Sequence, residues 1–257
     1  MTRGTGRVTR STAGRRRWVL AASAAETWRR GAAGWRALPP RARRRWGRVL
    51  LSGWVGYALL ALALAVAGRH LAAEGMDTRD REQLLALVEH GPMSFQAAIW
   101  FEGWGSSAML IPVTLVGVVV AARAGRALLV LTLAAAYLLH DPLVLLMGWV
   151  WPRARPDLVA GGIASPPLHS FPSGHLVQVV AVYGLLAYLW ARRSPSAAER
   201  LVAAAAVVGL AAVVGYARLR LGTHWPSDLW AALPVGAGWL LSCILALRAG
   251  ERGAADG

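Results

Sequence analysis

Six long apolar runs, separated by short polar stretches, dominate the chain. A helix needs about 20 apolar residues to cross the hydrocarbon core of a bilayer, and somewhat shorter runs cross with tilt or with flanking polar residues. Because the runs leave no polar face for water, they disfavour the buried helices of a soluble all-α protein. The pattern therefore predicts an all-α, polytopic membrane protein, a bundle of six transmembrane helices. The predicted spans are 49–68, 106–122, 127–150, 176–191, 201–216 and 229–247.

Composition supports this interpretation. The chain has 257 residues, of which 56% are hydrophobic, and it carries a formal net charge of +15. All 28 basic residues are arginine. A soluble protein of this length is rarely so apolar and so basic at once. The single cysteine, Cys243, lies in an apolar run, which excludes an intrachain disulfide.

The placement of the arginines predicts the orientation in the cell membrane. Half of them precede the first span, and others flank the second and fourth turns between spans or follow the last span. All of these fall on one side if the spans alternate, and the positive-inside rule makes that side cytoplasmic. We therefore expect a multi-pass protein with both termini in the cytoplasm. The opposite, extracytoplasmic side receives 69–105, 151–175 and 217–228.

The chain divides into a basic arm, a membrane domain and a short tail. We expect residues 1–48 to form a disordered cytoplasmic arm that touches anionic lipid headgroups, with Pro39-Pro40 separating it from the first span. Its arginines are not interleaved with residues that would read bases, so nucleic acid is not an expected partner. Residues 49–248 form the six-span domain, and 249–257 form a cytoplasmic tail.

Two polar features lie near the expected membrane domain, and each has two interpretations. The longest outer segment, 69–105, contains a stretch from Arg81 to Trp104 whose apolar spacing predicts short amphipathic helices on the outer surface. These helices either connect two spans or cover a site. In the third span, His140 and Asp141 place ionisable groups at membrane depth, which is costly unless they are paired or reach water. They form either a hydrogen-bonded kink or a polar contact that lines a site.

Three short segments carry candidate chemistry, and each lies where an apolar span meets an outer loop. Arg155-Pro156 follows the third span, and an arginine offers a planar fork of donors that matches two phosphate oxygens. Ser173-Gly174 opens the fourth span, where these residue types expose backbone N–H groups to an anion. His175 then lies in the first helical turn, beside whatever those groups bind.

The third segment contains Arg218, His224 and Asp228. Residues four apart share a helix face, so a helix start at Pro226 brings the carboxylate close to the imidazole. A carboxylate that accepts one ring N–H fixes the tautomer and leaves the other nitrogen able to attack. The alternative is an interfacial His–Asp pair that only joins two spans. Together the three segments supply the parts needed to hold a phosphate and attack its phosphorus.

In order and spacing, the segments resemble the type 2 phosphatidic acid phosphatase superfamily. Its signature is a lysine, six residues and Arg-Pro; then Pro-Ser-Gly-His; then Ser-Arg, five residues, His, three residues and Asp. The resemblance covers roughly 50–248. Residues 172–175 match in full, and the other two segments match at Arg155-Pro156, Arg218, His224 and Asp228.

The resemblance implies a role for each matching position. His224 would be the nucleophile that forms a phosphohistidine, Asp228 would orient it, and His175 would protonate the leaving group. The phosphate-binding positions that it implies are Arg155, Ser173, Gly174 and Arg218. It implies no metal ion and no other cofactor.

The sequence departs from the family at two positions. Gly148 stands where the family has its lysine, and Ala217 stands where it has a serine. A phosphate pocket without that lysine binds its ligand less tightly or depends on a substitute cation. Arg153 and Arg220 are the candidate substitutes, and Arg153 is the one we favour.

The sequence thus predicts metal-independent hydrolysis of a lipid phosphomonoester or diphosphate at the outer leaflet. Candidate substrates are polyprenyl phosphate or diphosphate, phosphatidic acid and phosphatidylglycerol phosphate. One alternative is a catalytically weak or inactive homologue that binds lipid phosphate, and another is a transporter with His140 and Asp141 as its coupling pair. Neither the choice of lipid nor the oligomeric state follows from the sequence.

Overall fold

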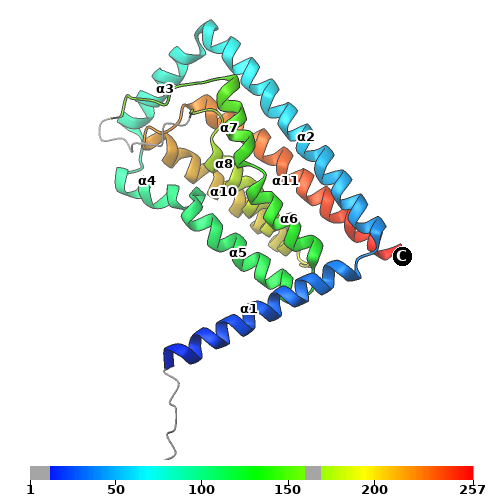
Figure 1. Ribbon diagram of the computed structural model, residues 1–257. Helices are drawn as coiled ribbons and strands as arrows, with labels where there is room; N and C mark the ends of the chain where they lie inside the picture. Colours follow the sequence, from blue (N-terminus) through cyan, green and yellow to red (C-terminus); the bar gives the residue numbers. More distant parts are fainter. Residues whose placement is uncertain (1–11, 160–168, 257) are drawn as a thin grey trace, which may run out of the picture.

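Helices build almost the whole of the described structure. The computed structural model describes residues 12–159 and 169–256, which form helices joined by short turns with no strand among them (Figure 1). The helices are α1 Thr12–Ala37, α2 Pro40–Leu71, α3 Asp77–His90, α4 Phe95–Glu102, α5 Ser107–Arg123, α6 Ala127–Leu138, α7 Asp141–Val150, α8 Gly174–Gln178, α9 Gly184–Ala191, α10 Ala197–Arg220 and α11 Pro226–Ala255. Short π or 3₁₀ turns join some of them at η1 Ala72–Met76, η2 Gly103–Gly105 and η3 Val179–Tyr183.

Six helical segments of the described chain are long and apolar enough to cross a membrane. Each predicted span lies inside one of them, so the prediction of an all-α bundle with six transmembrane helices is confirmed. The segments are Pro40–His90, Phe95–Arg123, Ala127–Val150, Gly174–Ala191, Ala197–Arg220 and Pro226–Ala255.

The first and last spans pack closely against each other. Helices α2 and α11 run side by side over most of their length (Figure 1). At mid-length the ring of Tyr57 stacks on that of Trp239, with 5.2 Å between centroids. The fully buried Trp239 also donates its indole N–H to the carbonyl of Ala136, at 3.0 Å. A buried indole needs such an acceptor, and this one joins α11 to α6.

The third span is broken in the middle. Helix α6 ends at Leu138 and α7 begins at Asp141, directly before Pro142. The buried His140 has its Nδ1 2.6 Å from the Tyr57 hydroxyl, and Asp141 accepts a hydrogen bond of 3.0 Å from Gln178. These contacts pair one nitrogen of His140 and one oxygen of Asp141, whereas His140 Nε2 is buried without a hydrogen-bond partner among the described residues. They match the hydrogen-bonded kink, the first of the two interpretations of this pair.

The basic arm is more ordered than the sequence indicated. The prediction of disorder is wrong for 12–48, because α1 is helical over Thr12–Ala37 and α2 begins at Pro40. Alanine and arginine, which dominate α1, are strong helix formers, and the helix packs against α5 and α6. Residues 1–11 lie outside the described part of the chain.

The opposite end of the bundle gathers the outer segments. The predicted outer helices are present as α3 and α4, and α3 follows α2 through a bend at Gly75. Gly75 has a φ of 98°, which glycine adopts without strain. Helices α3 and α4 both contact α10, so they lie over the end of the bundle at which α10 ends and α11 begins (Figure 1).

The close packing of α2 on α11 gives a stability prediction. A Cβ on Gly53 would come within 2.6 Å of the Ser242 Cβ, whereas a Cβ on Gly56 would meet nothing within 4 Å. We expect Gly53→Val to destabilise the protein by about 1–3 kcal/mol through overpacking, and Gly56→Val to have little effect. Thermal unfolding of both variants in detergent, followed by tryptophan fluorescence, measures the difference. Equal melting temperatures would contradict this account of the helix contact.

Candidate active site

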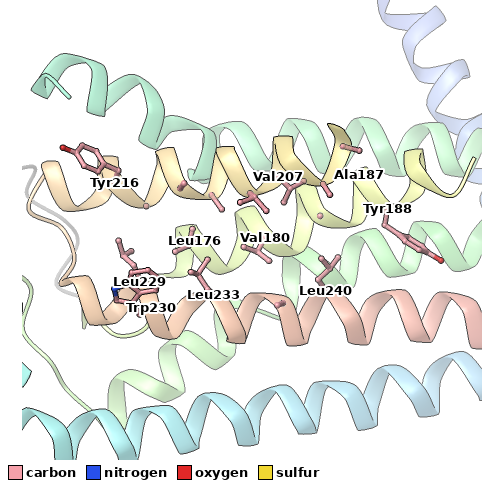
Figure 2. Close-up of a pocket in the computed structure, with 18 of the residues that line it drawn as sticks. Leu176, Val180, Ala187, Tyr188, Val207, Tyr216, Leu229, Trp230, Leu233 and Leu240 are labelled. Atoms are coloured by element: carbon pink, nitrogen blue, oxygen red, sulfur yellow. The ribbon is translucent and has the colours of Figure 1, made fainter. Parts of the chain in front are cut away.

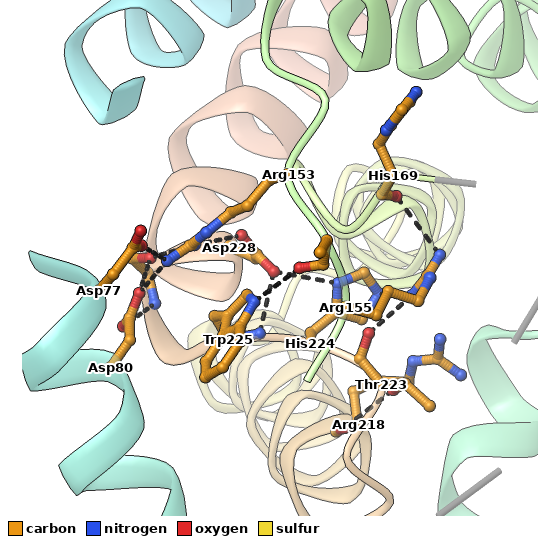
Figure 3. Close-up of polar contacts among 12 residues, drawn as sticks. Asp77, Asp80, Arg153, Arg155, His169, Arg218, Thr223, His224, Trp225 and Asp228 are labelled. Carbon is orange, nitrogen blue, oxygen red and sulfur yellow. Dashed lines mark hydrogen bonds and ion pairs between the residues drawn. The ribbon is translucent and has the colours of Figure 1, made fainter. Parts of the chain in front are cut away.

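The three predicted segments meet at the end of the bundle where α10 ends and α11 begins. Arg155 comes from the extended stretch after α7, and Arg218 comes from the last turn of α10. His224 lies in the turn between α10 and α11, and Asp228 lies in the first turn of α11. Figure 3 shows these side chains converging from separate elements. The remaining predicted residues, Ser173, Gly174 and His175, form the start of α8.

His224 and Asp228 form the buried centre of the site. The His224 Nδ1 lies 3.5 Å from the Asp228 Oδ2, and the two side chains are 2% and 0% exposed. At this separation Nδ1 is near the carboxylate but has no hydrogen-bond partner among the described residues. The local reason is the helix start: Pro226 opens α11, and Asp228 accepts the backbone N–H of Trp225 at 2.9 Å. This cap holds the carboxylate next to the imidazole. The other ring nitrogen, Nε2, faces Arg155 Nη1 at 3.4 Å.

The surroundings keep His224 uncharged at neutral pH. Burial is the largest influence and lowers its pKa; the contact with Asp228 opposes this, and the nearby Arg218 adds to the lowering. The result is a pKa of about 4. A neutral imidazole with one nitrogen toward a carboxylate can act as a nucleophile through the other nitrogen, once the lone pair of that nitrogen faces the substrate rather than Arg155.

Arg155 lies on the open side of His224. Its Nη1 donates to the carbonyl of Thr223 at 2.6 Å, and its Nη2 donates to the carbonyl of His169 at 3.5 Å. Burial and then repulsion from Arg218 lower the pKa of Arg155 to about 10, while Asp228 acts in the other direction. The guanidinium therefore stays charged at neutral pH. Two arginines this close together favour an anion between them.

Arg218 and His175 share an acidic partner from the outer helices. Glu102, at the end of α4, has its Oε2 2.5 Å from Arg218 Nη1 and 3.4 Å from His175 Nε2. Two donors near this cluster, Ser173 Oγ and Arg218 Nε, are buried without a hydrogen-bond partner among the described residues. Buried donors are normally satisfied, and an anion held by Arg155 and Arg218 would satisfy these two.

The two candidate substitutes for the family lysine lie elsewhere. Arg153 is 6% exposed and contacts the carboxylates of Asp77, Asp80 and Asp228. Arg220 donates to the carbonyl of Met93. This geometry disfavours both as phosphate ligands.

The space beside Gly148 is occupied by a different side chain. A Cβ on Gly148 would lie 2.4 Å from the His169 Cδ2, so the imidazole covers the face from which a lysine at 148 would project. His169 itself is exposed. The two positions are therefore sterically linked, because the absence of a side chain at Gly148 makes room for the His169 ring.

Sequence reasoning missed three acidic residues of the outer helices. Asp77 and Asp80 on α3 and Glu102 on α4 all contact site arginines. The outer segment therefore contributes to the site and does more than connect two spans. One signal was present in the sequence, because Glu102 is the only charged residue between 91 and 122. Its partner, however, is separated from it by more than a hundred positions.

A large apolar cavity lies in the membrane region, and none of the predicted site residues lines it. It has a volume of about 770 Å³ and lies between α10, α11 and the α8–α9 segment (Figure 2). Three lining residues, Leu176, Leu219 and Leu229, directly follow site residues in the chain. The far end is lined by Tyr188 and Arg200.

Comparison with known proteins agrees with this site. The sequence profile of the PAP2 superfamily matches residues 126–251, which contain all three segments. Phosphatidylglycerophosphatase B of Bacillus subtilis (strain 168) is 32% identical over 89 residues, which is 33% of this chain and 41% of that relative. The chain thus matches less than half of the relative's length.

A solved structure shares the fold. It is the transmembrane PAP2 type phosphatidylglycerolphosphate phosphatase from Bacillus subtilis, with a TM-score of 0.59 and 23% identity, covering 74% of this chain and 94% of that one. The six apolar helices described for this chain and the shared fold support a multi-pass membrane protein. The chain belongs to the PAP2 superfamily, which confirms the resemblance seen in the motifs.

The Gly148–His169 pair gives a prediction about phosphate affinity. Gly148→Lys alone should not tighten phosphate binding, because the His169 ring blocks the new side chain. Gly148→Lys combined with His169→Ala should tighten it by roughly tenfold, since one charge-assisted contact is added. Inhibition by inorganic phosphate measures both, with His169→Ala as the control. Equal inhibition of the single and double variants would refute the steric link.

Proposed function

We propose that the chain is an integral membrane lipid phosphatase that hydrolyses a lipid phosphomonoester or diphosphate through a phosphohistidine. The observation that carries the proposal is the state of His224. Its imidazole is buried and neutral, with Nδ1 toward Asp228 and Nε2 toward Arg155. A nucleophile held next to a phosphate-binding cation is the arrangement that phosphoryl transfer requires.

In the first step, His224 Nε2 attacks phosphorus and the bond from phosphorus to the leaving oxygen breaks. The proton on Nδ1 stays against Asp228, which stabilises the positive charge that develops on the ring. His175, at the start of α8, gives a proton to the leaving oxygen. In the second step, His175 takes a proton from water, the water oxygen attacks phosphorus, and the P–N bond breaks. Inorganic phosphate leaves and His224 is restored.

The phosphate oxygens would be held by Arg155, Arg218, the Ser173 hydroxyl and the backbone N–H of Gly174. Support comes from the unsatisfied Ser173 Oγ and Arg218 Nε and from the position of Gly174 at a helix start. These contacts stabilise charge on the equatorial oxygens in the transition state. A bound phosphate would share Arg218 with the carboxylate of Glu102.

The proposed substrate is a lipid whose headgroup lies in the outer leaflet. Polyprenyl phosphate or diphosphate, phosphatidic acid and phosphatidylglycerol phosphate all fit this description, and the names of both relatives favour the last. The apolar cavity between α10, α11 and the α8–α9 segment suits a hydrocarbon chain, because it lies among membrane-spanning helices and three of its lining residues each follow a site residue in the chain. The proposed mechanism uses no metal ion.

A second candidate function is binding of lipid phosphate with little or no turnover. It is favoured by one observation, the ring of His169 beside Gly148, where the family has a cation. Catalysis and binding differ at His224, because turnover needs the nucleophile whereas binding needs mainly the arginines. The transporter alternative has less support, since His140 and Asp141 are engaged in contacts within the bundle.

The first functional prediction concerns the nucleophile. We expect His224→Ala to lower phosphate release by roughly 10,000-fold or more, because no other group can form the P–N bond. The exposed His90 on α3 provides the matched control, and His90→Ala should act like the native chain. The assay measures phosphate released by purified protein from each candidate lipid, with a chelator present. Substantial turnover by His224→Ala would end the phosphohistidine mechanism.

The pKa of His224 adds an expected pH dependence to the same assay. Protonation removes the lone pair of Nε2, so kcat/KM should fall as the pH drops toward the His224 pKa of about 4. Above that value the neutral imidazole persists, and this group should cause no loss through neutral pH. An acid limb centred near pH 7 would contradict the assignment of His224 as a buried, neutral nucleophile.

The second functional prediction concerns the side of the membrane on which the site lies. In a Cys243→Ser background, Asp157→Cys places a thiol at the outer end and Pro195→Cys places one between the fourth and fifth spans. With the proposed cytoplasmic termini, only the first should react with a membrane-impermeant maleimide in intact cells. The reverse pattern would place the site on the cytoplasmic side.

A further inference from the structure

The Arg153 side chain lies in a buried pocket of carboxylates behind the active site. Its Nη1 is 2.7 Å from Asp228 Oδ1 and 2.7 Å from the Ser227 hydroxyl. Its Nη2 is 2.6 Å from both Asp77 and Asp80 on α3. The guanidinium therefore joins α3 to the first turn of α11. That turn carries Asp228, the residue that faces His224.

The two oxygens of Asp228 face opposite sides. Oδ2 accepts the backbone N–H of Trp225 and lies against His224, while Oδ1 accepts from Arg153. The carboxylate is fully buried, so each oxygen depends on a protein donor. Rotation of the carboxylate would break the Arg153 contact and the helix cap together. Arg153 thus fixes the plane in which Asp228 presents Oδ2 to the imidazole.

The surroundings hold the guanidinium itself in place. Its central carbon lies 4.7 Å from the ring centroid of Trp151 and 5.4 Å from that of Trp225. Burial acts to lower the pKa of Arg153, but attraction to Asp228 and the bonds to Asp80 and Asp77 together raise it. The group is therefore a permanent cation with a defined orientation.

We propose that Arg153 is a positioning residue that acts on the nucleophile His224 through Asp228, with Asp77 and Asp80 holding it in place. The proposal rests on the function proposed above and gives the outer helix α3 a part in it. Figure 3 shows Arg153 and Arg155 on opposite sides of the His224–Asp228 pair. Two arginines separated by one residue thus have different tasks: Arg155 faces the phosphate site, and Arg153 supports the carboxylate behind it.

A residue that only held α3 against α11 would make the same contacts but would not affect the titration of the His224 imidazole. The distinction appears in the titration of His224, because Arg153 partly neutralises Asp228. Without this cation, the carboxylate would favour a protonated imidazole, and the pKa of His224 would rise. The other charged or titratable groups near the ring are Arg155, Arg218 and His175, and they remain unchanged.

The test uses the purified full-length chain in detergent with Arg153→Gln. NMR of the protein labelled at histidine gives the pKa of His224. The His224 signal is assigned as the one that is absent from His224→Ala. We expect the pKa to rise by about one unit in Arg153→Gln. The control is Arg81→Gln, which removes an exposed arginine from the same outer helix and should leave the pKa unchanged. This measurement needs no turnover, so it separates failure of the inference from failure of the proposed function.

Kinetics with a lipid phosphate give the second readout. Arg153→Gln should lower kcat by about 10- to 100-fold, because a misplaced nucleophile loses alignment, with KM nearly unchanged. Since the loss of a buried charge partner can also prevent folding, Arg153→Lys provides an independent test. Lysine keeps the charge but is a point donor without the planar fork, so kcat should fall by about 5- to 10-fold while the His224 pKa stays near native. An unshifted pKa in Arg153→Gln, or native kcat in Arg153→Lys, would overturn the proposal.

Discussion

The carboxylate of Asp228 is the constraint on which the site depends. It is fully buried at the start of a membrane-spanning helix, where an unpaired charge would be very costly. Its two oxygens are satisfied from opposite directions, by the helix cap and His224 on one side and by Arg153 on the other. Each of these contacts orients a neighbour. The helix start, the tautomer of the imidazole and the position of α3 therefore follow from the need to satisfy one group.

The membrane explains where charged groups such as Asp228 lie along the spans. Charged groups of the site lie at the ends of spans, and the spans themselves are joined by apolar packing such as that of Tyr57 on Trp239. Ionisable groups in the middle of a described span are confined to the break between α6 and α7, where His140 Nδ1 contacts Tyr57 and Asp141 accepts a hydrogen bond from Gln178. The bundle is thus a rigid apolar support with a polar cluster at one end, which suits chemistry on a lipid headgroup at the membrane surface.

The departure from the family at Gly148 is part of a coordinated change. Loss of the lysine side chain leaves a space that the His169 ring covers, and neither Arg153 nor Arg220 moves into the phosphate site to replace it. The outer helices meanwhile bring a carboxylate, Glu102, to Arg218. The site thus lacks the cation that the family signature has at this position, and that loss would weaken the stabilisation of charge on the phosphate oxygens.

The sequence alone predicted the six spans and the grouping of the three motifs on one face, because apolar run length and motif spacing are local properties of the chain. It left two interpretations of His140 and Asp141 open. It did not reveal the helix at 12–37, the acidic partners on α3 and α4, or the side of Asp228 on which Arg153 lies. Tertiary structure decided these. The partner of a buried charge is whichever opposite charge the fold brings near, and for Arg153 that partner is more than seventy positions away.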